Sequence, residues 1–576
     1  MTIKKNRTPA FTALLLLFTF IPNAVAQETP RPAPTVQRER RVSASEPRPA
    51  QTPTPQPTPT PTPTPTPPAR PGEGFGPGSA ARASAARANA PKTVEELRAR
   101  IEAVLNNPDL APSQMAVKVV SLDTGRTLFE ENAEKLLHPA SNMKIYTVAA
   151  ALDRLGPDYR FKTSAYAPSM PDANGTIRGD LVIYGRGDPS FAASFNGGDY
   201  DKAVDEFAAR IAASGVKRIE GNVVGDESYF TGGRLGYGWE WDDLQWYFGA
   251  EVSALTVNDN ALDLFVRPGQ SVGSQAVVET GPVSPAVQVV NRATTSPRGT
   301  RRDLTVVRPL GSNVIEVSGT VPLGLDLTDK GLIGSVAVPN PPLVFLYMLR
   351  SALASRGVTI TGQSLVADAR ARLTQPLRTE SLVELASRES PPLSVVIAQT
   401  MKPSQNLYTE LLLRTLGKAS VPGGVVSPLE RTSVDDGVEA VKSFLRGAGI
   451  EPRGQFVMAD GSGLSRHNYI TAGATVRLLT YMASHRYAGV FRDSLPVAGV
   501  DGTLRTRLRD TPAQGNMRAK TGTINAVAAL SGYVTSAAGE RLVFSIILNN
   551  YPEESSSRRS HLDAIAVLLA SFAGRS

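Results

Sequence analysis

The chain has 576 residues, 41% of them apolar, and a formal net charge of +8. A chain of this length is too long for one hydrophobic core and predicts roughly two to four domains. It contains no cysteine and only four histidines. This composition excludes disulfides, a thiolate nucleophile and a cysteine-type zinc site, and it argues against a histidine-rich metal site. We therefore expect neither a metal ion nor a cofactor.

The first 26 residues have the pattern of a secretory signal. Basic residues precede a short apolar run, Ala10 to Ile21, and Ala24-Val25-Ala26 forms an A-x-A cleavage site. The apolar run is shorter than an ordinary membrane span. We expect residues 1–26 to be removed and the mature chain to be periplasmic, or otherwise extracytoplasmic. The alternative is an N-terminal anchor that is retained.

Residues 27–91 predict an extended stalk outside any folded domain. Thr52 to Pro68 is almost entirely Thr-Pro, a composition that favours polyproline II and buries no core. The chain before residue 92 carries +7 of the formal charge, which leaves +1 for residues 92–576. A near-neutral folded part gives no case for nucleic-acid binding. A weak contact of the basic stalk with an anionic surface stays open beside the simpler interpretation, a solvated tail.

From residue 92 onward the pattern indicates α/β structure. Thr93 to Asn106 predicts a helix, because an N-cap Thr is followed three residues later by Glu, as in a capping box. Met115 to Leu122 alternates like a β-strand, and Thr127 to Phe129 follows a turn as its hairpin partner. Apolar residues then recur at helical spacing from Ile145 to Leu155, which places Ser141 at the start of a helix.

Ser141 and Lys144 form the first candidate catalytic pair. They lie three residues apart and therefore on one helix face, with Ser141 near the unpaired N–H groups of the first turn. A lysine whose pKa is lowered by desolvation can take the proton of a serine hydroxyl. The pattern alone is weak, because Ser214 and Lys217 repeat it in an ordinary amphipathic segment. The non-catalytic interpretation of this pattern is a helix N-cap serine followed by a solvated lysine.

Two further short motifs follow in the chain. Ser404-Gln405-Asn406 lies between two predicted helices, where a tight loop can present a hydroxyl and an amide to a cleft. The same pattern begins at Ser194, so it is also weak alone, and its alternative is a helix N-cap. Lys520-Thr521-Gly522-Thr523 precedes two β-like runs, Ala526 to Val534 and Leu542 to Asn549. The alternative for this motif is a strand-edge lysine before a turn.

Together and in this order, the three motifs resemble the active site that penicillin-binding proteins share with serine β-lactamases. The 263 residues from Ser141 to Ser404 exceed what a simple β-lactamase needs. This spacing resembles the class C low-molecular-mass penicillin-binding proteins, the D-Ala-D-Ala carboxypeptidase/endopeptidase family S13. The resemblance covers about residues 92–576 and extends to Leu155 to Phe161, Gly187-Asp188-Pro189, Gly238 to Asp243, Asp460 to Arg466 and Gly499 to Leu504.

The resemblance implies an α/β (α+β) transpeptidase fold, in which an antiparallel sheet is flanked by helices. Residues 92–164 and 376–576 would together form the penicillin-binding domain. Residues 165–375 would form large, mainly β inserted subdomains, one nested in the other as in the family. Whether this insertion shapes the substrate cleft or binds the cell-wall polymer stays open.

The resemblance also implies how the serine would react. Lys144 takes the proton from Ser141, which attacks the carbonyl of a D-alanyl peptide bond. The backbone N–H groups of Ser141 and Thr523 meet the oxyanion. Ser404 relays a proton to the leaving amine, and water then frees the acyl-enzyme.

The expected partners are peptidoglycan peptides and β-lactams. By the same resemblance Asn406 holds the substrate amide, while Lys520 and Thr521 of the Lys-Thr-Gly motif bind the terminal carboxylate. Some family members carry an acidic residue that meets an amino group of the stem peptide before the Gly-Trp turn. Arg234 stands at the matching place here, so the side-chain preference can differ.

Three alternatives of different classes stay open at this point. A serine β-lactamase would share the acylation step but free the acyl-enzyme quickly. A non-catalytic peptidoglycan-binding protein would be expected to have lost one of the motifs, and all three are intact. A Ser-His-Asp hydrolase would need a histidine beside the nucleophile, and His138 is near Ser141 in the sequence.

Overall fold

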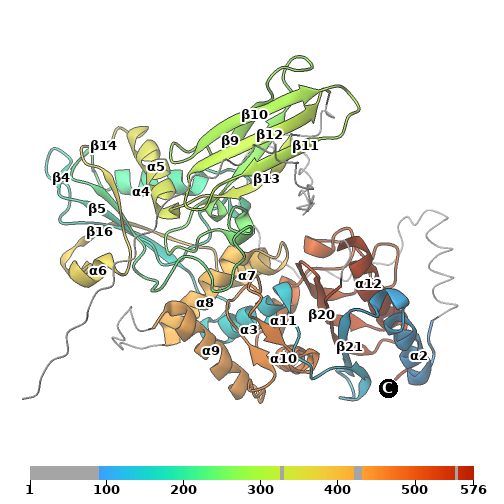
Figure 1. Ribbon diagram of the computed structural model, residues 1–576. Helices are drawn as coiled ribbons and strands as arrows, with labels where there is room; N and C mark the ends of the chain where they lie inside the picture. The colour runs from blue at the N-terminus through green and yellow to red at the C-terminus, as the bar shows by residue number, and fades with distance from the viewer. Residues whose placement is uncertain (1–89, 325–329, 421–430, 552–554) are drawn as a thin grey trace, which may run out of the picture. The chain divides into compact units, whose positions relative to one another are not determined.

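A computed structural model describes residues 90–324, 330–420, 431–551 and 555–576 (Figure 1). The predicted signal and the predicted stalk up to residue 89 lie outside these residues. In the described ranges no helix is both long and apolar enough to cross a bilayer. Ala90 and Pro91, assigned above to the stalk, are buried, and the Pro91 carbonyl accepts a hydrogen bond from Ala573 N. We therefore propose that the folded part includes Ala90.

A five-stranded antiparallel sheet joins the two ends of the chain, as the sequence predicted (Figure 1). Its strand order is β19-β20-β21-β1-β2. β1 pairs along its whole length with β21, from Gln114 opposite Asn549 to Ser121 opposite Leu542. β19, which carries the Lys-Thr-Gly motif, is an edge strand. The bounds are β1 (Gln114–Ser121), β2 (Thr127–Glu131), β19 (Arg518–Ile524), β20 (Val527–Thr535) and β21 (Arg541–Asn549).

Two helices from opposite ends of the sequence cover one face of this sheet. They are α2 (Val94–Leu105) and α12 (Ser555–Ser571). Phe544 and Ile546 of β21 point into the core that these helices close. Thr93 caps α2 as predicted, because its hydroxyl accepts a hydrogen bond from Glu96 N. The Glu96 carboxylate accepts from Lys92 N, one residue before the predicted partner.

The other face of the sheet carries a layer of helices, reached by the alternate residues Val543 and Ile547 of β21. Within this layer every residue of α3 from Met143 to Leu152 is buried. A helix buried on all sides is a core helix rather than an amphipathic surface helix. Lys144 is therefore carried into the interior. The helices are α3 (Met143–Leu155), α7 (Leu393–Met401), α8 (Asn406–Ser420), α9 (Ser433–Gly447), α10 (Ala472–Ser484) and α11 (Ala488–Ser494), with the hairpin β17 (Phe456–Val457) and β18 (Tyr469–Ile470).

The insertion after α3 contains a second five-stranded sheet, in the order β15-β7-β5-β3-β16. β5, β7 and β15 are mutually parallel. Parallel neighbours need crossover connections, and helices usually supply them. Here α4 lies between β5 and β7 in sequence and α5 between β7 and β15, so this part is α/β. The elements are β3 (Lys162–Ala167), β5 (Leu181–Tyr184), α4 (Lys202–Ala212), β7 (Val223–Asp226), α5 (Pro341–Ala354), β15 (Ser364–Ala367), α6 (Ala371–Thr374) and β16 (Val383–Glu389), with a small sheet of β4 (Thr176–Arg178), β6 (Arg218–Glu220) and β14 (Thr359–Ile360).

Between β7 and α5 lies a nested part made of β-strands, in keeping with the mainly β expectation. It forms two three-stranded sheets, β13-β8-β9 and β10-β12-β11, around a core of its own. β3 begins before residue 165, and its partner β16 lies entirely after residue 375. Because these paired strands belong to the sheet of the insertion, we propose limits near Lys162 and Glu389 for the whole insertion. The strands are β8 (Ala261–Arg267), β9 (Val277–Gly281), β10 (Gln288–Ser296), β11 (Asp303–Val307), β12 (Val314–Pro322) and β13 (Leu332–Ala337).

Candidate active site

Ser141 lies in a single 3-10 turn, Ala140–Asn142, directly before α3. Ala140 has a left-handed backbone with φ of +46°, which costs a residue with a Cβ about 1–3 kcal/mol. Two glycines make room for this turn. A Cβ added at Gly463 would lie 1.8 Å from the Ala140 carbonyl oxygen, and one added at Gly522 would lie 2.6 Å from that of Pro139. The glycine of the Lys-Thr-Gly motif thus lets the edge strand pack against the serine turn.

The side-chain nitrogen of Lys144 contacts groups from three separate parts of the chain. Its Nζ lies 2.9 Å from Ser141 Oγ, 2.6 Å from Asn406 Oδ1 and 2.7 Å from the Ser462 carbonyl oxygen. The amide and carbonyl oxygens can only accept hydrogen bonds, whereas the serine hydroxyl can also donate. A neutral amine has two N–H groups for the two obligate acceptors, and its lone pair is left facing Ser141. The geometry therefore suits a lysine that acts as a base.

The pKa of Lys144 fits this arrangement. Burial of the fully enclosed side chain lowers its pKa to about 7, while the nearby carboxylates of Asp460 and Glu410 act in the opposite direction. Desolvation disfavours the charged form of a lysine. A substantial fraction of Lys144 is therefore neutral near pH 7, which an exposed lysine would not be.

The second and third motifs meet at Lys520. Ser404 also has a left-handed backbone, with φ of +66°, and its Oγ accepts a hydrogen bond of 2.8 Å from Lys520 Nζ. Lys520 also donates to the Thr521 carbonyl, and Thr521 Oγ1 lies 2.7 Å from Thr503 Oγ1. Burial lowers the pKa of Lys520 well below its ordinary value, and the charge of Lys144 acts in the same direction. Thr523, two residues after Thr521 on the same edge strand, is exposed.

The loop after β17, which contains the Asp460 to Arg466 stretch, supports the site next to Lys144. Asp460 accepts hydrogen bonds of 2.8 Å each from Gly463 N, Ser465 N and the indole Nε1 of Trp239. These bonds close the loop and direct the Ser462 carbonyl to Lys144. A single buried carboxylate therefore fixes one of the three groups around the lysine.

Two supporting groups were missed by the sequence analysis. Glu410 Oε1 accepts a hydrogen bond of 2.8 Å from Ser462 N, and burial raises the pKa of Glu410 to about 7. Glu410 stands four residues after Asn406, one helical turn along α8, and this spacing could have identified it. The Phe248 carbonyl, which accepts from Asn406 Nδ2 at 2.9 Å, had no signal in the sequence because any residue supplies a backbone oxygen.

His138 is held away from a catalytic role. Asn549 bonds its backbone N and O, its ring stacks on Tyr469 with centroids 4.5 Å apart, and burial lowers its pKa. Among the described residues, its buried Nδ1 has no hydrogen-bond partner. The polar partner of Ser141 is Lys144, so the Ser-His-Asp alternative has no geometric support.

The repeated patterns and Arg234 also have structural explanations. Ser214 Oγ donates to the Ile211 carbonyl at the end of α4, as a helix-terminal serine does. Ser194 Oγ lies 3.0 Å from the Tyr408 hydroxyl. Arg234 forms ion pairs with Glu227 and Glu251. These carboxylates balance its charge inside the insertion.

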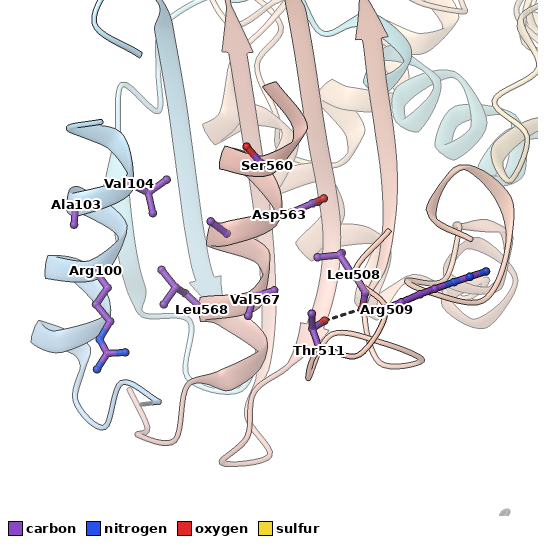
Figure 2. A pocket seen from close by; sticks show the side chains of 11 residues that line it. Arg100, Ala103, Val104, Leu508, Arg509, Thr511, Ser560, Asp563, Val567 and Leu568 are labelled. Carbon is purple, nitrogen blue, oxygen red and sulfur yellow. Dashed lines mark hydrogen bonds between the residues drawn. The ribbon is translucent and has the colours of Figure 1, made fainter. Parts of the chain in front are cut away.

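Two other features are formed by residues outside the three motifs. In the described ranges one group of carboxylates could hold a metal ion, formed by Glu240, Asp242 and Asp243, but Arg466 already pairs with Glu240. A hollow of about 670 Å³ lies between α2, α12 and the Leu508–Thr511 turn, and apolar side chains such as Val104 and Leu568 line it (Figure 2). None of the candidate site residues lines this hollow.

Replacement of Gly463 by alanine tests how closely the loop must approach the serine turn. The new Cβ would overlap the Ala140 carbonyl, so Ser141 must shift, and a shift of about an ångström can cost about 100-fold in rate. We expect the labelling rate with a fluorescent penicillin to fall by about that factor. Gly454→Ala is the matched control, because Gly454 has a similar φ of +76° but nothing within 4 Å of the new Cβ. Equal labelling rates in the two variants would contradict this account.

Comparison with known proteins gives matches over most of the chain. The model of the D-Ala-D-Ala carboxypeptidase 3 (S13) family matches residues 97–572. A D-alanyl-D-alanine carboxypeptidase of Actinomadura sp. (strain R39) is 35% identical over 491 residues, which cover 83% of this chain and 85% of that protein. The D-alanyl-D-alanine carboxypeptidase DacB of Haemophilus influenzae is 28% identical over 452 residues, 77% of this chain and 87% of that protein.

The fold comparison gives the same result. The crystal structure of penicillin binding protein 4 from Haemophilus influenzae superposes with a TM-score of 0.66 at 25% identity, covering 81% of this chain and 97% of that chain. That protein has also been solved in complex with a β-lactam. The three motifs, their shared site and these matches lead to one conclusion: the chain belongs to the D-Ala-D-Ala carboxypeptidase 3 (S13) family.

Proposed function

We propose that this protein is a serine D-Ala-D-Ala carboxypeptidase, or D-alanyl endopeptidase, that acts on peptidoglycan stem peptides through an acyl-enzyme on Ser141. The observation that carries the proposal is the position of Lys144, whose buried Nζ lies 2.9 Å from Ser141 Oγ with two obligate acceptors beside it. Membership of the family supplies the substrate class. The names of the Actinomadura and Haemophilus relatives support the same reaction.

In the acylation step, neutral Lys144 takes the proton of Ser141 Oγ as this oxygen attacks the carbonyl carbon of the penultimate D-alanine. The negative charge that develops on the carbonyl oxygen would be met by the backbone N–H groups of Ser141 and Thr523. The C–N bond then breaks and the leaving amine takes up a proton. We propose that Ser404, whose Oγ accepts a hydrogen bond from Lys520, donates that proton. The proton that Lys144 took from Ser141 then returns to Ser404, which leaves Lys144 neutral for the next step.

The acyl-enzyme is then hydrolysed. Water attacks the ester carbonyl, Lys144 takes a proton from that water, and Ser141 Oγ recovers its proton as it leaves. The net reaction consumes one water molecule and releases D-alanine, or an amine-bearing peptide when a cross-link is cut. No redox step or external group donor is needed.

Substrate binding would use the edge strand and the Ser404-Gln405-Asn406 turn. A terminal carboxylate would lie at Lys520 and Thr521, where its negative charge would favour the protonated form of Lys520 beside the Thr521 hydroxyl. Asn406 Nδ2 carries two hydrogens and gives one to Phe248 O. The second hydrogen would bind the substrate amide while Oδ1 remains on Lys144.

The same chemistry supports β-lactam binding, because a β-lactam carbonyl acylates a serine that is activated in this way. Peptidoglycan lies outside the cytoplasmic membrane, so we propose an extracytoplasmic location, in line with the predicted signal at residues 1–26. A serine β-lactamase differs only in fast deacylation. A non-catalytic wall-binding protein would have no need for a buried lysine beside Ser141.

Peptide hydrolysis tests the proposed reaction. The wild-type protein should release D-alanine from muropeptides that end in D-Ala-D-Ala, or cut dimers cross-linked through D-Ala. It should cleave L-Ala-L-Ala analogues at least about 100-fold more slowly. The reason is that contacts to the carbonyl, the amide and the carboxylate together select one configuration of the reacting centre. Mass spectrometry of the products gives the rates, and Ser141→Ala is the inactive control. Equal cleavage of both peptides would refute the role of Lys520 and Thr521, and rapid nitrocefin turnover without peptide cleavage would indicate a β-lactamase.

The pH dependence of acylation tests Lys144 as the base. Since its pKa is about 7, protonation below that pH blocks proton transfer. The acylation rate constant should fall about tenfold per pH unit on the acidic side and level off above about pH 7 to 8. Stopped-flow acylation by a chromogenic β-lactam from about pH 5 to about pH 9 measures this profile.

Glu410→Gln provides the matched control for that profile. Glutamine keeps an oxygen that accepts from Ser462 N but removes the charge that favours protonated Lys144. The inflection should therefore move to lower pH. An inflection that does not move, or one that survives in Lys144→Ala, would mean that another group takes the proton.

A further inference from the structure

Three consecutive residues of the insertion have a left-handed backbone that is rare for side chains with a Cβ. They are Asn258, Asp259 and Asn260, with φ of +47°, +60° and +53°. Each such residue costs about 1–3 kcal/mol and persists only where the surroundings hold it in place. Here Asn260 Oδ1 accepts from Val257 N, and Asn258 Oδ1 accepts from Ala193 N. The turn presents the Asp259 side chain to α8.

The carboxylate of Asp259 interacts with two side chains at the Ser404-Gln405-Asn406 turn. The Tyr408 hydroxyl donates to Asp259 Oδ1. The Gln405 side chain is near enough to the Asp259 carboxylate to act against the rise of its pKa, and Gln405 Oε1 accepts from Leu407 N at 3.1 Å. Asp259 thus holds Tyr408 in the first turn of α8 and lies beside Gln405, the residue between Ser404 and Asn406.

The turn itself needs such support. Ser404 has a strained backbone with φ of +66°. The side chains of Ser404 and Asn406 must also keep their contacts with the two lysines. Ser404 Oγ must stay 2.8 Å from Lys520 Nζ, and Asn406 Oδ1 must stay 2.6 Å from Lys144 Nζ. A shift of the turn would disturb both lysines at once.

We propose that Asp259 is a positioning residue, through which the inserted region holds the Ser404-Gln405-Asn406 turn in place for acylation. The inference rests on the proposed function and gives the insertion a part in catalysis. Asp259 contacts neither Ser141 nor either lysine, so its effect is transmitted through Gln405 and Tyr408. Burial raises the pKa of Asp259 to about 6, so near neutral pH the side chain is mainly the ionised acceptor that a tyrosine donor favours.

A neighbouring carboxylate offers a matched control. Asp263 lines the same hollow of about 200 Å³ as Asp259. It accepts from the Tyr200 hydroxyl and from Ser335 Oγ, each at 2.5 Å. Both of these partners belong to the insertion. Asp263→Asn therefore removes a similar carboxylate from the same hollow without loosening a contact to the Ser404-Gln405-Asn406 turn.

The experiment separates non-covalent binding from acylation in the full-length protein. Stopped-flow labelling with a fluorescent penicillin gives the binding constant and the acylation rate constant for the wild type, Asp259→Asn, Asp259→Ala, Tyr408→Phe and Asp263→Asn. We expect the acylation rate constant of both Asp259 variants to fall about 10-fold to 100-fold, with the binding constant changed less than about threefold. Asp259→Asn should be the milder of the two, and Asp263→Asn should acylate at the wild-type rate.

A double variant tests whether Asp259 acts through Tyr408. If it does, the acylation rate constant of the double variant Asp259→Asn with Tyr408→Phe should fall below the wild-type value by much less than the product of the two single-variant factors. Equal acylation by the wild type and the Asp259 variants would overturn the inference, as would an equal loss in Asp263→Asn. If Asp259→Ala does not fold, Asp259→Asn and Tyr408→Phe still decide the question. Failure of the proposed function would look different, because the wild type itself would then not be acylated.

Discussion

The structure depends above all on the burial of one amine. Lys144 lies on a helix whose residues from Met143 to Leu152 are all enclosed, and an unpaired ammonium in such a place would cost several kcal/mol. The chain lowers this cost in two ways. It surrounds Nζ with oxygen atoms from Ser141, Asn406 and Ser462, and it places Asp460 and Glu410 nearby. The balance leaves the lysine close to half-protonated at neutral pH, which suits a group that must accept and return a proton.

That constraint explains why the site is assembled from distant parts of the chain. The serine turn precedes the core helix, the amide comes from the start of α8, the carbonyl comes from the loop after β17, and the second lysine comes from the edge strand. Each part can approach only because the others leave space, as Gly463 and Gly522 do around the Pro139–Ala140 backbone. The five-stranded sheet and the helices on its two faces hold these parts in one position.

The insertion contributes to the same site instead of being an independent appendage. The Trp239 indole bonds Asp460, the Phe248 carbonyl accepts from Asn406, and Asp259 bonds Tyr408. These contacts reach two of the groups around Lys144. A region that the sequence indicated only as a large, mainly β insertion is therefore linked through Asp460 and Asn406 to the groups that bond Lys144.

The parts that could be predicted from the sequence are those with a local physical cause. Ser141 and Lys144 meet because they are three residues apart at the start of a helix. Thr93 caps a helix, and a recognisable turn connects β1 and β2. Asp259 and the Ser462 carbonyl were not predicted, because their roles arise from tertiary contacts over many residues. Glu410 was not predicted either, although its position one helical turn after Asn406 is a local signal. The mainly β expectation for the insertion did not include the helices α4 and α5, which supply the crossovers between its parallel strands. The left-handed conformations of Ala140 and Ser404 had no signal, because neither residue is a glycine.

The most direct test of the account is to locate the covalent adduct. The full-length protein would be incubated with benzylpenicillin, denatured and digested, and the modified peptide would be sequenced by tandem mass spectrometry. The account predicts a penicilloyl group on Ser141, at close to one per protein chain, and none on Ser404 or Ser462. An adduct on another serine, or no adduct while the fold is intact, would contradict the assignment of Ser141 and Lys144 as nucleophile and base.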